Sequence, residues 1–166
     1  MALLKDGKII EDRWTHLDDD SAAPEGKPVT VSLARWRNDS ENLKASGAPL
    51  GIRLTGADDV EDIADALENL QLVAIAFPAF TDGRGYSMAR ILRERYGYAG
   101  EIRATGNVLC DQASLMTRCG FDAFDLAPHV SVDDWFEVLS LVDVQYQPAA
   151  DRRPTAAQLR HASCLQ

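Results

Sequence analysis

Short apolar runs alternate with amphipathic stretches along most of the chain. Runs rich in apolar and β-branched residues predict strands over residues 29–36, 50–54, 72–77, 101–105 and 121–126. The stretches between them predict helices over residues 38–46, 60–70, 86–96, 108–119 and 132–143. The run Leu72–Phe77 is apolar at every position, which is typical of a parallel strand buried on both faces. We therefore expect this strand in the interior of a sheet.

Three residues mark the ends of predicted helices. Asp59 and Ser131 each precede an apolar periodicity and are expected to act as N-caps. Gly120 follows the helix over 108–119 and suits a left-handed C-terminal cap.

Alternating strands and helices with short connections favour an α/β fold. We expect a single domain with a mainly parallel sheet of about five strands and helices on both faces. A fragment of a (β/α) barrel is the main alternative, since a closed barrel needs about 250 residues and the chain has 166. The expected organisation is an N-terminal hairpin or edge segment with an acidic loop (1–28), the α/β domain (29–146) and a C-terminal tail (147–166).

Composition and charge limit the possible partners. The chain has 17 Lys plus Arg against 26 Asp plus Glu, so its formal charge of −9 disfavours non-specific binding of nucleic acid. The longest apolar stretch, 70–80, is interrupted by Gln71 and Pro78 and is too short to cross a bilayer. The first residues do not resemble a secretory leader. We expect a cytoplasmic protein that does not enter membranes.

Cysteine and histidine spacing does not indicate a metal site. Cys110, Cys119 and Cys164 show no Cys-x-x-Cys pattern. Nine helical steps would place Cys110 and Cys119 on opposite faces of one helix. The three histidines are scattered. We expect neither a metal centre nor a disulfide framework.

The loop over residues 77–87 is the first candidate for chemistry, because it leaves the central strand at its carboxyl end and enters a helix. Gly83 and Gly85 would let the backbone take positive φ and approach a ligand, while Arg84 offers a planar fork for sulfate, sulfite or phosphate. This pattern predicts an oxyanion pocket. The structural alternative is a tight turn in which Asp82 caps the helix and Arg84 pairs with a carboxylate.

The loop over residues 103–112 is the second candidate, because it would face the same crevice. Arg103, Asp111 and Gln112 supply donors and acceptors, and Asn107 is also a natural helix N-cap. Cys110 would lie in the first helical turn, where the helix dipole lowers a thiol pKa. A small apolar filler is the alternative for Cys110.

The block Phe77–Phe124 contains the strings DGRGYS and RCGFDAF. With Trp14, Val31–Trp36 and Leu50–Leu54, it resembles the bacterial domain-of-unknown-function 934 family, whose genes often neighbour assimilatory sulfite reductase. The resemblance covers about residues 10–126. Combined with the two loops, it gives the predicted oxyanion-binding set of Asp82, Gly83, Arg84, Gly85, Tyr86, Ser87, Arg103, Asp111 and Gln112.

This resemblance implies an oxidoreductase or redox component of assimilatory sulfite reduction, and the two loops predict that it binds an oxyanion at the carboxyl edge of the sheet. The sequence has no flavin, nicotinamide, haem or iron–sulfur motif, so the cofactor stays open and electrons would come from a partner. The alternative is a non-catalytic accessory protein that binds sulfite reductase or delivers an intermediate to it. A phosphosugar or nucleotide binder that uses the same pocket is a third reading.

We also expect a homo-oligomer, most simply a dimer. Trp14, Trp36 and Trp135 are candidates for its contact, with a place in the core as the alternative for each.

Overall fold

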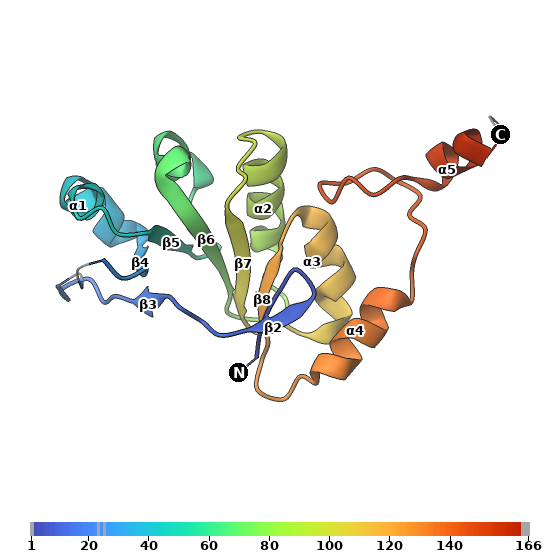
Figure 1. Ribbon diagram of the computed structural model, residues 1–166, viewed down its shortest axis with the longest axis horizontal. Coiled ribbons are helices and arrows are strands. Elements are labelled where there is room, and N and C mark those ends of the chain that lie inside the picture. The colour runs from blue at the N-terminus through green and yellow to red at the C-terminus, as the bar shows by residue number, and fades with distance from the viewer. Residues whose placement is uncertain (1, 23, 25, 164–166) are drawn as a thin grey trace.

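An eight-stranded sheet organises the chain, whose computed structural model describes residues 2–22, 24 and 26–163. The strands are β1 (Leu3–Lys5), β2 (Lys8–Ile10), β3 (Thr15–His16), β4 (Val29–Ser32), β5 (Leu50–Leu54), β6 (Leu70–Phe77), β7 (Glu101–Gly106) and β8 (Ala123–Asp125). The α-helices are α1 (Leu33–Ala45), α2 (Arg84–Glu94), α3 (Ala113–Cys119), α4 (Val132–Ser140) and α5 (Ala156–Ser163). Two 3₁₀ segments are also present, η1 (Val60–Asn69) between β5 and β6 and η2 (Cys110–Gln112) before α3. Figure 1 shows this arrangement.

The sheet is mixed, with the strand order β2-β1-β8-β7-β6-β5-β4-β3. The strands β3 to β8 pair in parallel, each beside the next in sequence. Strand β1 runs antiparallel to both β2 and β8. The α/β class is confirmed, whereas the expectation of about five mainly parallel strands is wrong. The N-terminal strands have only two or three residues each, which is too short for a recognisable periodicity.

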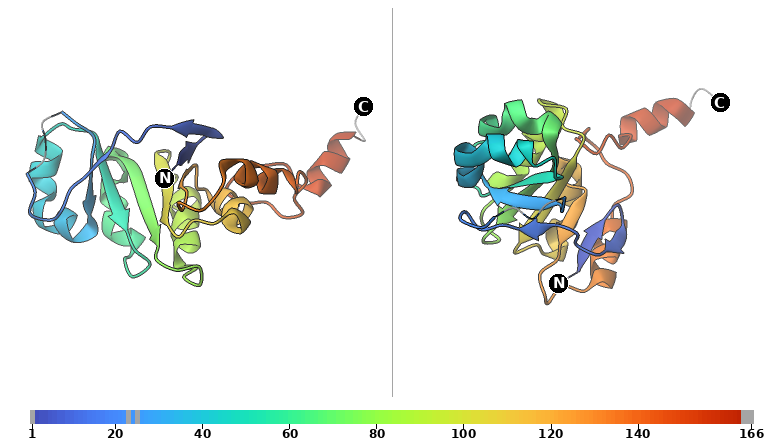
Figure 2. Two further views of the ribbon diagram at one scale, coloured as in Figure 1. Left: turned by 90° about the horizontal axis from the view of Figure 1, so that it is seen from below. Right: turned by 60° about the vertical axis from the view of Figure 1, so that its left-hand side comes forward.

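Helices cover one face of the parallel part of the sheet, and not both faces as expected. When each strand joins its neighbour on the same side, right-handed crossovers place successive helices on one face. Val73 and Ile75 of β6 belong to the main core on that face. Leu72 and Ala74 pack on the opposite face against Trp14 of the N-terminal segment, and Figure 2 shows this segment running along the sheet. The strand order is that of a (β/α) barrel, but the sheet remains open.

The interior position of β6 is confirmed. It pairs in parallel with β5 on one side and with β7 on the other. The strand begins at Leu70, two residues before the predicted run. Its apolar positions are needed on both faces because one faces the helices and the other faces Trp14.

The predicted helix caps are confirmed. The side chains of Asp59 and Ser131 accept hydrogen bonds from the backbone N–H groups of Glu61 and Asp134, respectively. Gly120 closes α3 in the left-handed conformation, with φ of +106°.

Several elements differ from the prediction. The predicted helix over 108–119 is divided into η2 and α3, and the predicted strand over 121–126 is limited to β8. The predicted strand 29–36 ends at Ser32, whose hydroxyl accepts from the N–H of Arg35 and starts α1. The cap at Ser32 therefore ends the strand and begins the helix, although residues with β propensity continue to Trp36. The predicted helix over 60–70 is present as η1, a 3₁₀ helix.

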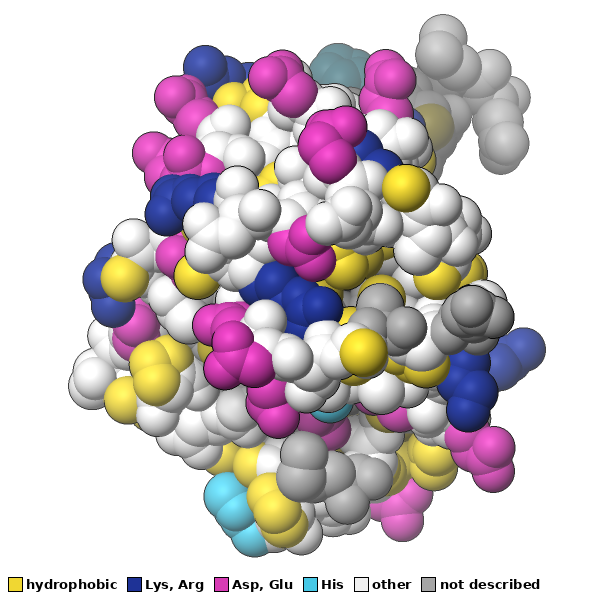
Figure 3. Space-filling view, turned by 90° about the vertical axis from the view of Figure 1, so that its left-hand side faces the viewer, with side chains coloured by type: hydrophobic (Ala, Val, Ile, Leu, Met, Phe, Trp, Pro, Cys, Tyr) yellow, Lys and Arg dark blue, Asp and Glu magenta, His cyan; other side chains and the backbone are white. Residues whose placement is uncertain are grey.

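Trp14, Trp36 and Trp135 are all buried, so the expectation that they form an exposed contact is wrong and the core alternative holds. Figure 3 shows acidic and basic side chains interspersed over the end of the molecule that carries α1 and β3. Within the described residues, no helix combines the length and the apolar character that a membrane span requires.

Candidate functional site

The two loops that were predicted to form the anion site meet at the carboxyl edge of the sheet. The loop after β6 turns through a hydrogen bond from the N–H of Asp82 to the carbonyl of Ala79 and enters α2. The loop after β7 folds back on β6, since the N–H of Asn107 donates to the carbonyl of Phe77 at 2.8 Å. Gly106 makes this return possible with φ of +91°. Adjacent parallel strands therefore bring both loops to one edge.

The guanidinium of Arg84 is bound to the carboxylate of Asp82. Its Nε donates to Oδ1 at 2.9 Å and its Nη2 to Oδ2 at 2.8 Å. The pair lies on Gly56 of the loop after β5, where a Cβ would be 2.8 Å from Arg84 Nε. The hydrogen bonds from Arg84 lower the pKa of Asp82 to about 2. The fork predicted to hold an oxyanion thus holds the chain's own carboxylate, as in the structural alternative.

Gly83 and Gly85 do not adopt the positive φ that we expected. Gly83 has φ of −87°, and neither glycine is among those with positive φ. Gly85 is instead required by packing, because a Cβ there would lie 2.7 Å from Cζ of Phe77 and 3.0 Å from Cγ2 of Ile75. This glycine brings the start of α2 close to β6.

Tyr86 and Gln112 join the two loops. The ring of Tyr86 packs on Phe77 with centroids 5.2 Å apart. Burial raises the pKa of Tyr86, and a hydrogen bond with Gln112 opposes that increase. Gln112 is buried, and its Oε1 accepts from the N–H of Leu109 at 3.1 Å. This bond caps η2, so Asn107 does not have the capping role that was predicted for it.

Arg103 lies away from both loops, on the helix-free face of β7. Its side chain is 3% exposed. The Nε donates to Oε1 of Glu101 at 2.8 Å, and Nη1 donates to Oδ2 of Asp12 at 2.8 Å. Strand alternation directs residue 103 to the opposite face from its neighbours Ile102 and Ala104. Arg103 therefore does not join Arg84, while Ser87 and Asp111 lie exposed at the edge.

A network of charged side chains, which we call the polar face cluster, surrounds Arg103. Lys5 Nζ binds Oε2 of Glu101 at 2.7 Å, and His16 Nε2 lies 3.9 Å from Oδ2 of Asp12. On β5, two strands away from β7, Arg53 Nη2 donates to the carbonyl of Leu17 at 2.8 Å. The cluster consists of Lys5, Asp12, His16, Arg53, Glu101 and Arg103.

Sequence reasoning missed every member of the polar face cluster except Arg103. The signal was the alternation of polar and apolar residues over 101–105, which indicates a strand with one polar face. Burial, followed by the nearby charge of Arg53, lowers the pKa of His16. These contacts hold the N-terminal segment against the sheet, and Arg103 is already paired with Glu101 and Asp12.

The described cysteines are not activated. Burial is the main cause that raises the pKa of Cys110 and of Cys119 above the ordinary value. Cys164 lies outside the described residues. No group of three metal-ligating His, Cys, Asp or Glu side chains occurs in the part of the chain that the structure describes.

Comparison with known proteins identifies the family. The model of the family described as "Bacterial protein of unknown function (DUF934)" matches residues 51–156. A search of curated proteins finds no match. The matched segment contains β5 to β8 and both loops of the carboxyl edge. The chain therefore belongs to the DUF934 family of bacterial proteins.

Proposed function

We propose that the chain is a non-catalytic accessory protein of sulfite reduction that docks on sulfite reductase through its C-terminal region. The choice of reaction and partner rests on the resemblance carried by residues 77–124. The choice of docking over catalysis rests on the contacts and exposure of side chains.

The observation that carries this proposal is a run of exposed apolar side chains after α4. Leu141, Val142, Val144 and Tyr146 are 71%, 49%, 45% and 83% exposed. We call residues 141–146 the apolar segment. In Figure 1 the chain leaves α4 through this segment, and α5 stands away from the sheet. Neighbouring exposed apolar residues of this kind typify protein interfaces.

The contacts at the carboxyl edge also favour an accessory role. An oxidoreductase or redox component with an oxyanion at this edge needs a cationic donor that is free to bind it. Arg84 binds Asp82, and Arg103 binds Glu101 and Asp12. An anion that displaced Asp82 would leave that carboxylate beside an added negative charge. Oxyanion binding here stays a prediction, which titration of sulfite into wild type and Arg84→Ala tests.

Charge is divided unevenly along the chain. Residues 1–146 carry 14 basic and 25 acidic side chains, a net −11, whereas residues 147–166 carry three basic and one acidic, a net +2. An acidic body beside a basic tail suits steering toward a partner of mixed charge. The homodimer was predicted to use Trp14, Trp36 and Trp135, which are buried. If a dimer forms through the exposed apolar segment instead, light scattering should give twice 18.2 kDa.

The experiment is a titration of purified sulfite reductase with the chain and its variants. Wild type should bind, and Val144→Asp combined with Tyr146→Asp should weaken binding by about 30-fold or more, because interface aromatic residues often contribute over about 2 kcal/mol. Leu115→Asp is the matched control, since Leu115 is 52% exposed on α3, outside the apolar segment. Absence of binding by wild type, or equal weakening by Leu115→Asp, would contradict the proposal.

A further inference from the structure

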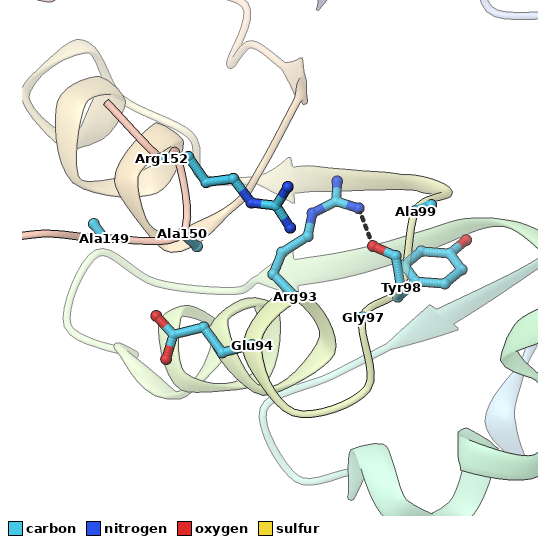
Figure 4. Close-up of a pocket in the computed structure, with 8 residues that line it drawn as sticks. All are labelled: Arg93, Glu94, Gly97, Tyr98, Ala99, Ala149, Ala150 and Arg152. Carbon is cyan, nitrogen blue, oxygen red and sulfur yellow. Dashed lines mark hydrogen bonds between the residues drawn. The ribbon is translucent and has the colours of Figure 1, made fainter. Parts of the chain in front are cut away.

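A hollow of about 520 Å³ lies between the end of α2, the loop before β7 and a turn of the C-terminal tail. It lies at the opposite end of α2 from the carboxyl edge and shares no lining residue with the two loops there. Figure 4 shows two arginines at this hollow, Arg93 from α2 and Arg152 from the tail, with their guanidinium groups next to one another. The rest of the wall is mostly small residues and Tyr98.

Arg93 is fixed in place by several acceptors. Its Nε donates to the carbonyl of Gly120 at 2.9 Å, and its Nη1 donates to the carbonyls of Tyr98 and Gly100. Its Nη2 binds Oδ2 of Asp122 at 2.8 Å. These bonds order the guanidinium and balance its charge.

Arg152 contrasts with Arg93 because it makes no ion pair within the described residues. Its backbone has φ of +55°, a conformation that costs a non-glycine residue about 1 kcal/mol or more. The turn is closed by a hydrogen bond from the N–H of Arg152 to the carbonyl of Ala149 at 3.1 Å. The side chain of Arg152 is exposed and lines the hollow.

The turn that carries Arg152 is anchored on α3. The N–H of Ala150 donates to the carbonyl of Arg118 at 3.1 Å, and Arg118 also pairs with Asp151. The Asp151 side chain is only 6% exposed. This anchoring holds the tail against the body at the rim of the hollow.

Gly120 allows Arg93 to pack closely against the residues after α3. A Cβ at this position would lie 2.4 Å from Cγ of Arg93 and 3.5 Å from Cβ of Ala150. The string RCGFDAF, which the carboxyl edge does not use, therefore supplies Arg118, Gly120 and Asp122 to this second place in the fold.

We propose that the hollow binds a phosphate or sulfate ester of a small organic molecule, with its oxyanion on Arg152. Two of the nearby acids are paired by hydrogen bonds, Asp122 with Arg93 and Glu94 with Arg90, and Asp151 Oδ2 lies 3.6 Å from Arg118 Nη1, at ion-pair distance without a hydrogen bond. Arg152 thus carries the unbalanced charge of the hollow. The volume falls within the range of about 300 to 1,000 Å³ for small-molecule sites. The hollow is therefore larger than a free oxyanion requires.

Calorimetric titration with AMP, inorganic phosphate and adenosine tests this proposal. Wild type should bind AMP and, more weakly, phosphate, whereas adenosine, which lacks the oxyanion, should not bind. Arg152→Ala should weaken AMP binding about tenfold to a hundredfold, the scale of a charged hydrogen bond. Arg152→Lys should recover part of the loss, because an ammonium lacks the planar fork.

Arg153→Ala is the matched control, because Arg153 is the next residue in the same tail but lines a different hollow, beside Trp135. It should bind AMP as wild type does. Thermal melts should show that Arg152→Ala keeps the fold. Lack of AMP binding by wild type, equal binding of adenosine, or equal loss in Arg153→Ala would overturn the proposal. The double variant Val144→Asp with Tyr146→Asp, whose residues do not line the hollow, should bind AMP as wild type does, so this test is separate from that of the proposed function.

Discussion

Burial decides how much an ion pair contributes to the stability of this protein. The Arg84 side chain is 63% exposed beside Asp82, so solvent screens the attraction between them. Arg103 is 3% exposed and its partner Glu101 is 6% exposed. Removal of Arg103 would leave a carboxylate in the interior with only Lys5 to compensate it. Arg103 therefore stabilises the fold, although the sequence predicted that its guanidinium binds an oxyanion.

We predict that Arg103→Ala lowers the free energy of unfolding by about 3 to 5 kcal/mol, as breaking a buried ion pair does. The control is Arg37→Ala, which removes an exposed pair with Asp62 and should cost less than about 1 kcal/mol. Urea denaturation measures both. Adding Glu101→Gln to Arg103→Ala should restore part of the loss, because it removes the uncompensated charge. Equal losses in the two single variants would show that the polar face cluster contributes no more than a surface pair.

At the scale of elements, the contact between α2 and β6 explains the DGRGYS string. Gly85 of this string allows α2 to start against Phe77 and Ile75 of β6. Apolar periodicity predicts α2, and the fully apolar run predicts β6, because each signal lies within one element. The requirement for Gly85 depends on a contact between two elements, which local periodicity does not reveal.

We predict that Gly85→Ala destabilises the fold by about 1 to 2 kcal/mol, since the cost of overpacking exceeds the gain in helix propensity. Gly83→Ala is the control, because the nearest atom to an added Cβ at this position is Cδ2 of Tyr86, at 3.7 Å. That change should alter the free energy of unfolding by less than about 1 kcal/mol. Thermal melts compare the two, and a larger loss for Gly83→Ala would contradict the packing role of Gly85.

At the scale of the molecule, the sequence predicts the α/β class and the interior strand but not the sheet as a whole. The placement of helices follows from the strand order, which long-range pairing determines. Strands β1, β2 and β3 are positioned by pairing with other strands. They contain no apolar run from which they could be predicted. The sequence predicts only part of the candidate site. It predicts that the two loops meet, because parallel strands bring them to one edge. It does not predict the partners of Arg84 and Arg103, because these depend on side-chain geometry.

We propose that the chain acts through docking by its apolar segment and not through chemistry at the carboxyl edge. Hydrogen–deuterium exchange of the chain, with and without sulfite reductase, tests it most directly. We predict protection of the apolar segment, residues 141–146, and unchanged exchange in loops 81–87 and 105–112. Protection of those two loops with unchanged exchange over 141–146 would contradict this proposal and favour a site at the carboxyl edge.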